Sequence, residues 1–346
     1  MTEKDPANRT ALIEMAMGFL RGKVLCAAVR LGIADALEDG PKHLGDLAAS
    51  TASTPDSLYR LLRALGGIGI LEEVGPRRFA LTDLGDALRK NAPNTVRASI
   101  VFWADLIADF WTYLPECVRA DGNPSASAVM EREGVKSRWS MEPEAVDMFH
   151  NVFAEPTADD MAAFAGAYDF SRCKVVADLG GAGGGLLCAI LSANRDARGV
   201  LVDRKEAVDG AASRISAAGF ADRCDLVVGD LLEEVPSGAD VYVLKSVLHG
   251  YGDDDARRIL ENCRTAMAAR SRLLVIDAVL PARIDRPNPT VERMLLSDIN
   301  MLAVTGGRER SETEWDTLLS SAGFERSGIV PVPGSDSSLI EAAPRG

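Results

Sequence analysis

Histidine is scarce in this chain of 346 residues: only His43, His150 and His249 occur. The six cysteines form no Cys-x-x-Cys pair and no cysteine–histidine spacing of a zinc site, so we predict reduced core cysteines and no bound metal. No apolar run approaches the ~20 residues that span a bilayer, and the first ten residues lack the apolar core of a secretory signal. The sequence therefore predicts a cytoplasmic protein with no membrane partner.

Excess positive charge is also lacking, since the formal net charge is −13. Residues 1–100 carry 13 Lys and Arg against 12 Asp and Glu, whereas the remaining residues carry 25 against 39. Such a surface repels polyanions, so nucleic acid is a poor candidate partner. The composition, 47% hydrophobic and 26% charged, is that of an ordinary globular protein, and the length predicts about two domains.

The first hundred residues have the pattern of a winged helix. Residues 11–40 repeat apolar side chains three and four apart, which predicts a helix. Two short helices are predicted within 43–71, with Pro55 early in the second, where its missing N–H is harmless. Two short strands surround the "GPRR" turn at 75–78. A winged helix raises the alternative of a DNA-binding regulator. Its second helix offers only Arg60 and Arg63 among four leucines, which favours packing or dimerisation over DNA binding.

Strands and helices alternate in the second half of the chain, after a mostly helical, aromatic-rich stretch over 100–165. Alternation of this kind predicts a parallel sheet with helices on both faces. The predicted strands are "KVVADL", "RGVLVD", "CDLVVGD", "DVYVLKSVL" and "RLLVIDAVL", and two final strands within 323–344 are predicted to form an antiparallel edge.

Acidic residues stand at three successive strand ends, where a sheet of this type binds ligands. Asp178 lies inside the glycine turn "DLGGAGGG", Asp203 ends the second strand and Asp230 ends the third. The turn is not a clean GxGxxG, and a carboxylate within it would repel a pyrophosphate, so NAD is disfavoured. Asp178 suits the cationic amino acid end of S-adenosylmethionine, Asp203 the ribose hydroxyls and Asp230 the adenine amino group.

His249 follows the fourth strand, and this segment alone leaves open a structural or solvent-facing role. Motifs along nearly the whole chain nevertheless resemble one family, including "GFLRGKVLCAAVRLGIADAL", "VVADLGGAGGGLL", "VLKSVLHGY" and "DINMLAVTGGRERSETEW". The chain resembles the plant caffeic-acid-type and bacterial small-molecule O-methyltransferases. The resemblance implies an α/β Rossmann-like class I methyltransferase domain, with a parallel sheet and an antiparallel edge strand, preceded by an α-helical winged-helix dimerisation domain. We expect dimerisation through 1–100, a helical linker with acceptor-pocket helices at 101–165, and a catalytic domain at 166–346.

The resemblance also implies a catalytic group. His249 corresponds to the family's general base, and Asp277 and Glu309 to the acids that orient it. Glu309 has an alternative interpretation as a solvated loop acid ahead of a helix capped by Ser311 and Glu314. The chain departs from the family at His249-Gly250-Tyr251, where His-Asp-Trp is usual, at Ala182 instead of glycine, and at Asp277, which is one methylene shorter than the usual glutamate.

The full set of predicted site residues follows from these arguments. The predicted cofactor-binding residues are Asp178, Gly180, Gly181, Asp203, Arg204, Gly229, Asp230, Leu231, Lys245 and Ser246. Among them, Lys245 is implied by the resemblance, in which a lysine four residues before the base contacts the cofactor. The acceptor-pocket residues are Trp103, Phe149, Asn151, Phe153, Met294, Asp298 and Met301, with core packing explaining the two methionines equally well and His150 assigned to core or pocket wall.

The predicted function is S-adenosylmethionine-dependent O-methylation of a small aromatic or polyketide-like molecule by a homodimer, yielding S-adenosylhomocysteine, without a metal and within natural-product biosynthesis. Methylation of carbon, or use of S-adenosylmethionine as a structural ligand in a hydroxylase or decarboxylase, remains the alternative.

Overall fold

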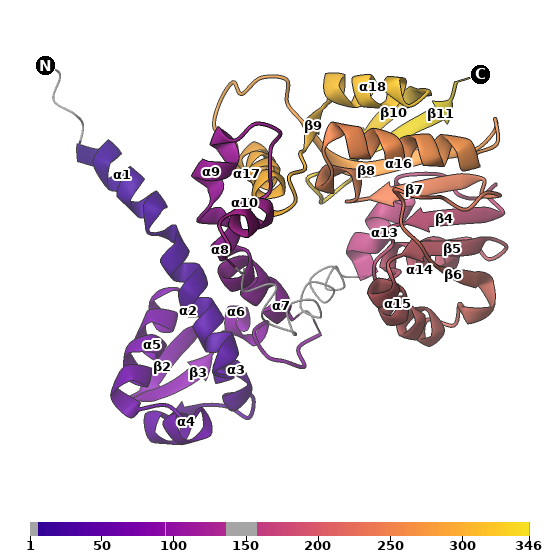
Figure 1. The fold of residues 1–346 in the computed structure, drawn as a ribbon. Helices are drawn as coiled ribbons and strands as arrows, with labels where there is room; N and C mark the ends of the chain where they lie inside the picture. Colours follow the sequence, from indigo (N-terminus) through magenta and orange to yellow (C-terminus); the bar gives the residue numbers. More distant parts are fainter. Residues whose placement is uncertain (1–5, 94, 136–157, 346) are drawn as a thin grey trace, which may run out of the picture. The chain divides into compact units, whose positions relative to one another are not determined.

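The computed structural model describes residues 6–93, 95–135 and 158–345 (Figure 1). The described residues fall into two compact units, residues 6–109 and residues 110–135 together with 158–345. The functional division expected at residues 100 and 165 stays a prediction. No helix of the described residues is long and apolar enough to cross a membrane.

The first unit consists of helices around a small antiparallel sheet (Figure 1). Its helices are α1 (Pro6–Ala16), α2 (Gly18–Arg30), α3 (Ile33–Ala36), α4 (Leu44–Ser50), α5 (Pro55–Gly67), α6 (Asp83–Asp86), α7 (Arg97–Val101) and the π-helix η1 (Phe102–Leu106), and its strands are β1 (Lys42–His43), β2 (Leu71–Gly75) and β3 (Arg78–Leu81). The hairpin predicted around "GPRR" is confirmed, and β1 is a third strand that the sequence pattern did not reveal.

Local chemistry explains the boundaries of these helices. The long helix expected over 11–40 is divided into three, and Gly32 ends the second with a φ of 66°, a conformation that glycine adopts without strain. Pro55 stands at the start of α5 as predicted. His43 is a capping residue, because its Nδ1 accepts a hydrogen bond of 3.1 Å from the Gly45 N–H at the start of α4.

The second unit is a layered α/β domain (Figure 1). Helix α8 (Ala108–Trp111) spans the boundary between the units. The remaining elements are α9 (Leu114–Arg119), α10 (Ala126–Arg132), α13 (Ala158–Gly166), β4 (Val175–Leu179), α14 (Gly185–Ala193), β5 (Arg198–Asp203), α15 (Lys205–Ala217), η2 (Ala221–Arg223), β6 (Cys224–Val228), β7 (Val241–Lys245), η3 (Leu248–Gly250), α16 (Asp253–Ala266), β8 (Arg272–Leu280), α17 (Pro289–Val304), β9 (Arg310–Ser311), α18 (Glu312–Ser321), β10 (Phe324–Pro331) and β11 (Ser337–Pro344).

The strand order of the large sheet is β10-β11-β8-β7-β4-β5-β6, with β9 paired to the end of β8. The strands β4 to β8 run parallel, whereas β11 runs antiparallel to both β8 and β10. The predicted parallel sheet with an antiparallel edge is therefore confirmed, with the reversed strand β11 lying one position inside the edge.

Alternate residues of the central strands pack on opposite faces of the sheet. Ala177 and Leu179 of β4 join a core built with α16 and α18, whereas Val176 joins a core built with α13, α14 and α15. Burial on both faces explains why these strands are continuous apolar runs in the sequence. It also leaves the carboxyl ends of the strands as the place where polar side chains gather.

Candidate active site

The glycine turn after β4 contains a buried carboxylate. Asp178 is 1% exposed, and its Oδ2 has no hydrogen-bond partner among the described residues. Burial raises the pKa of Asp178 to about 7; the nearby Asp203 also raises it, and Lys245 opposes the shift. A buried carboxylate oxygen without a hydrogen bond is costly, and a cationic ligand would relieve that cost. This is the feature expected of a site for the ammonium group of S-adenosylmethionine.

The glycines of the turn are required by its geometry. A Cβ on Gly181 would lie 2.8 Å from the Asp178 carboxylate, and Gly180 has a φ of 71°. Ala182 and Ser246 also have positive φ values, of 46° and 54°, which side-chain-bearing residues rarely adopt. Strained residues of this kind cluster at functional sites. The departure at Ala182 is accommodated, because its N–H donates a 2.8 Å hydrogen bond to Asp203.

The other two strand-end acids bind the backbone around them. Asp203 accepts hydrogen bonds from the N–H groups of Ala182 and Arg204, one on each carboxylate oxygen, and Asp230 accepts one from Leu232. The Gly229 N–H donates to the Asp203 carbonyl. Leu231 is 7% exposed and packs in the core, so its side chain contributes to the sheet's packing.

Lys245 ends β7 between two acids. Its Nζ lies 4.7 Å from the ring centre of Phe164, a contact that sequence reasoning missed. Burial lowers the pKa of Lys245, while Asp178 and Asp277 oppose that shift. A cavity of about 400 Å³ opens beside this side chain, between α13 and the β10–β11 turn. Its lining consists of Asp160, Ala163, Phe164, Lys245, Val332, Pro333, Gly334 and Ser335.

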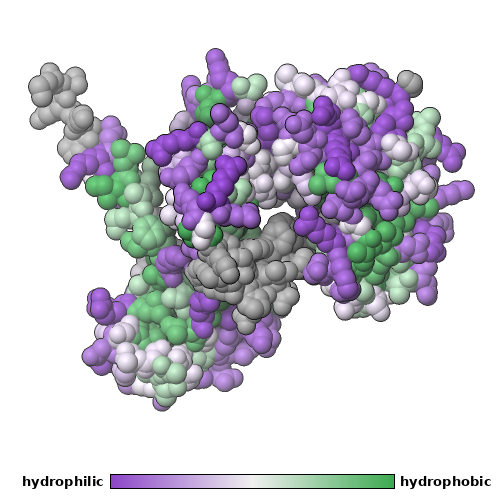
Figure 2. Space-filling model, viewed as in Figure 1, coloured by the Kyte–Doolittle hydropathy of each residue, from purple (hydrophilic) through white to green (hydrophobic). Residues whose placement is uncertain are grey.

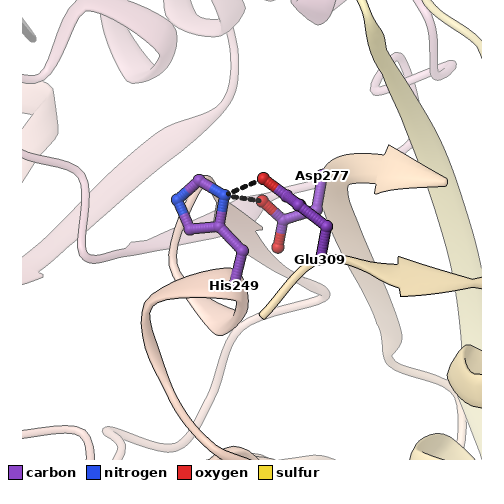
Figure 3. A group of neighbouring side chains, drawn as sticks. All are labelled: His249, Asp277 and Glu309. Atoms are coloured by element: carbon purple, nitrogen blue, oxygen red, sulfur yellow. Dashed lines mark hydrogen bonds and ion pairs between the residues drawn. The ribbon is translucent and has the colours of Figure 1, made fainter. Parts of the chain in front are cut away.

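The structure brings together His249, Asp277 and Glu309 from three separate segments (Figure 3). His249 Nδ1 lies 3.0 Å from Glu309 Oε1 and 3.6 Å from Asp277 Oδ1. Figure 3 shows both carboxylates on one side of the imidazole, with the second ring nitrogen, Nε2, on the other. The acidic side chains are 0% and 2% exposed, whereas that of His249 remains 19% exposed.

Electrostatics within this group favour a charged imidazole. Burial lowers the pKa of His249, but the charges of Asp277 and Glu309 oppose burial, and the net pKa is raised above 6.5. Burial likewise raises the pKa of Asp277 to about 6, with His249 opposing. Two buried acids beside one ring nitrogen stabilise the imidazolium that forms when the other nitrogen accepts a proton.

Glu309 is positioned by two residues of α17. Ser297 donates a 2.8 Å hydrogen bond from Oγ to Glu309 Oε1, and Asp298 accepts a 2.8 Å hydrogen bond from the Glu309 N–H. The solvated-loop interpretation of Glu309 does not fit this burial, although the capping box of Ser311 and Glu314 is present. Sequence reasoning missed Ser297. Its place directly before Asp298, the first residue of a segment that resembles the family, is the signal that could have found it.

The predicted acceptor residues have varied surroundings. Met294 is 9% exposed and Met301 is partly buried, both on α17, and Asp298 binds the backbone of Glu309. Trp103 belongs to the first unit and is 53% exposed. The remaining predictions, Phe149, His150, Asn151 and Phe153, lie outside the described residues.

His249 and its two acidic neighbours have the chemistry of metal ligands as well. Ligand atoms of His249, Asp277 and Glu309 lie within 4.8 Å of one another. The 3.0 Å contact between Nδ1 and Oε1 has the length of an ordinary N–H···O hydrogen bond, so a proton on Nδ1 satisfies the pair. A cation at this place would compete with that proton.

Comparison with protein families agrees with this geometry. Residues 111–325 match the model of the O-methyltransferase domain, and residues 13–91 match that of the O-methyltransferase dimerisation domain. The chain belongs to the O-methyltransferase family. It is an S-adenosylmethionine-dependent methyltransferase, as the sequence predicted.

Individual relatives align with this chain over most of their length. O-demethylpuromycin-O-methyltransferase of Streptomyces alboniger is 36% identical, over 98% of this chain and 92% of the relative. The 8-amino-8-demethylriboflavin N,N-dimethyltransferase of Streptomyces davaonensis is 34% identical, over 89% of this chain and 88% of the relative. The crystal structure of CalO1, a methyltransferase in calicheamicin biosynthesis in its SAH-bound form, has a TM-score of 0.79, 36% identity and 99% coverage of both chains.

Proposed function

We propose that this methyltransferase transfers a methyl group to a hydroxyl of a small aromatic or polyketide-like molecule, with His249 as the general base. The observation that supports the proposal is the orientation of the imidazole. Its Nδ1 faces two buried carboxylates, so Nδ1 carries a proton and Nε2 offers a lone pair on the other side of the ring (Figure 3).

The acceptor hydroxyl must lose its proton during methyl transfer, and a general base removes it. A phenol has a pKa near ~10, so few molecules are ionised at neutral pH. His249 takes the proton at Nε2 as the phenolic oxygen attacks, and Asp277 and Glu309 stabilise the resulting cation. S-adenosylmethionine supplies a methyl group on a sulfonium, whose charge is lost on transfer. Holding the oxygen close to this methyl group is the other main contribution expected of the site.

The donor-binding residues follow from the strand ends. We assign the donor's ammonium group to Asp178, its ribose hydroxyls to Asp203 and its adenine amino group to Asp230. Gly180, Gly181, Arg204, Gly229, Leu231, Lys245 and Ser246 complete the proposed set. The Asp178 Oδ2, which has no hydrogen-bond partner in the part of the chain that the structure describes, supports this assignment most directly.

We also propose a homodimer that associates through the N-terminal domain. The helices α1 and α2 expose large apolar side chains, and Figure 2 shows green hydrophobic colouring along them. Leu12, Met15 and Phe19 are 68%, 75% and 65% exposed. Contiguous exposed apolar surface of this kind marks an interaction site, and the matching dimerisation domain makes a second copy of the chain the expected partner.

A nitrogen acceptor is the second candidate, because one relative is an N,N-dimethyltransferase. A neutral aromatic amine attacks through its lone pair and loses its proton afterwards, so it depends less on a base. Carbon methylation, or a structural use of S-adenosylmethionine, remains a more distant alternative. The two buried acids beside Nδ1 of His249 favour proton removal from oxygen.

The test compares two phenols of one skeleton, one of them made acidic by a nitro group, both chosen among acceptors that the wild-type enzyme methylates. His249→Gln should lower kcat on the weakly acidic phenol by ~10²–10⁴-fold, the usual contribution of a positioned base. The loss should be much smaller on the ionised nitrophenol, and donor affinity should change little. Equal losses on both phenols would contradict the proposal.

A further inference from the structure

Arg310 is a buried cation directly after Glu309. Its side chain is 1% exposed, and its guanidinium lies over the Trp315 ring at 5.3 Å from the ring centre. Nε and Nη2 both donate to Asp253 Oδ1, at 3.0 and 2.9 Å, but that carboxylate is 59% exposed. Burying a guanidinium is expensive, and one largely solvated partner offsets only part of the cost.

Two further donors of Arg310 bind the backbone on either side of His249, and a third donates a 3.3 Å hydrogen bond to the Arg308 carbonyl. Nη1 donates a 3.0 Å hydrogen bond to the Leu248 carbonyl, and Nη2 donates one of 3.0 Å to the Tyr251 carbonyl. These two carbonyls flank His249 and Gly250. The turn itself, η3, is a 3₁₀ helix of three residues, and such short turns have weak hydrogen bonds of their own.

Two residues close to Arg310 in the chain contact the carbonyl of His249. The Arg308 N–H donates a 2.8 Å hydrogen bond to the His249 carbonyl. A Cβ on Gly307 would lie 2.2 Å from the same oxygen, so only glycine permits this approach. The segment 307–310 therefore contacts the backbone of residues 248, 249 and 251, while Glu309, within that segment, binds the imidazole.

We propose that Arg310 is a positioning residue for His249. It links the backbone of the base to the segment that carries Glu309, so the 3.0 Å contact between Nδ1 and Oε1 is held from both ends. The fork of five N–H donors is needed, because one side chain must reach two carbonyls and a carboxylate at once. This inference rests on the proposed role of His249 as a base.

The matched substitution is Arg310→Lys, which keeps the charge and loses the fork. On the weakly acidic phenol, kcat should fall by ~10-fold or more, since small displacements of a catalytic group are costly. On the ionised nitrophenol the loss should be at least threefold smaller, and the Kd for S-adenosylmethionine by calorimetry should stay within about twofold. Arg326→Lys on β10, which removes a fork to Asp316 outside this segment, is the control and should match wild type on both phenols.

The outcomes separate this inference from the proposed function. The inference fails if the loss of kcat in His249→Gln depends on acceptor acidity while Arg310→Lys lowers kcat equally on both phenols. Arg310 would then serve folding alone. If the loss of kcat in His249→Gln does not depend on acceptor acidity, the assignment of His249 as the base fails. Should Arg310→Lys not fold, Asp253→Asn decides by the same criterion, because it removes the guanidinium's charged partner from an exposed position. A kcat ratio between the two phenols equal to wild type would then overturn the inference.

Discussion

Val247 packs against Gly180, so closely that a Cβ on Gly180 would lie 2.7 Å from Val247 Cγ2. Val247 stands two residues before His249, and Gly180 belongs to the turn that follows β4. The segment that carries the proposed base therefore touches the proposed donor-binding turn. Through this contact the turn and the proposed base, 69 positions apart in the chain, lie in neighbouring segments.

Gly180→Ala should weaken donor binding and slow turnover together. The added methyl meets Val247, and the φ of 71° disfavours any side chain, so both the turn and the His249 segment must shift. We expect a loss in donor affinity of about 10-fold or more, measured by calorimetry, and a lower kcat. Gly210→Ala lies on the exposed surface of α15, where the new Cβ meets no described atom beyond its own helix within 4 Å, and should leave both unchanged.

Asp178→Asn should affect stability and donor binding in opposite directions. The pKa of Asp178 is raised to about 7 by burial, so the folded protein holds a proton that the unfolded chain releases near pH ~4. Stability therefore falls as pH rises from about 4 to about 7, and the amide removes that dependence. Without donor, the Tm of the Asp178→Asn variant should exceed that of wild type at pH ~8, and the two Tm values should be nearly equal at pH ~4.

The same substitution should weaken donor affinity by about 1–3 kcal/mol, because a charge-assisted hydrogen bond is lost. Asp222→Asn, on an exposed turn, is the control for both measurements. A variant that binds the donor as tightly as wild type would remove Asp178 from the site.

Asp277→Asn should shift the acid side of the pH–rate profile. His249 acts as a base only when neutral, and its raised pKa places the onset of activity above pH 6.5. Asp277 is the largest charge that raises this pKa, so the amide should move the onset to lower pH. The maximal kcat should fall, because the imidazolium formed during transfer loses a stabilising charge. Asp254→Asn, whose side chain is 96% exposed, should leave the profile unchanged, and an unmoved onset in Asp277→Asn would refute this coupling.

Treatment with a chelator should leave activity intact. His249, Asp277 and Glu309 have ligand chemistry, but the proposed proton transfer needs a free Nε2 and a protonated Nδ1. Dialysis against EDTA should not change kcat, and added Zn²⁺ should inhibit, since zinc binds neutral imidazole and carboxylates. Loss of activity with EDTA and recovery with one metal would require a different mechanism.

Charged substitutions on the exposed face of α1 and α2 should separate the proposed dimer. Met15→Glu combined with Phe19→Glu introduces charge where apolar contact is expected, while glutamate maintains helix propensity. Sedimentation at micromolar concentration should show a 36.9 kDa species for the variant and twice that mass for wild type. Ile284→Glu, exposed by 62% in the second unit, should remain dimeric.

Local sequence patterns determined much of this protein. The apolar runs of β4, β5 and β7 predicted buried parallel strands, because residues covered on both faces must all be apolar. Asp178 and Asp203 were predictable as site candidates because carboxyl ends of parallel strands meet at one edge. His249, Asp277 and Glu309 were assembled through a family resemblance, since no spacing in the sequence connects them.

Tertiary structure alone decided how these groups are held. Ser297 and Arg310 look like ordinary polar residues in the sequence, yet one binds the Glu309 carboxylate and the other binds the backbone on either side of His249. The antiparallel position of β11 inside the edge likewise depends on pairing with β8, whose partner residues lie 59 to 69 positions earlier in the chain. Hydrogen bonds and strand pairing between distant segments leave no periodic pattern in the sequence. They depend on which segments the fold brings together, and not on the spacing of residues along the chain.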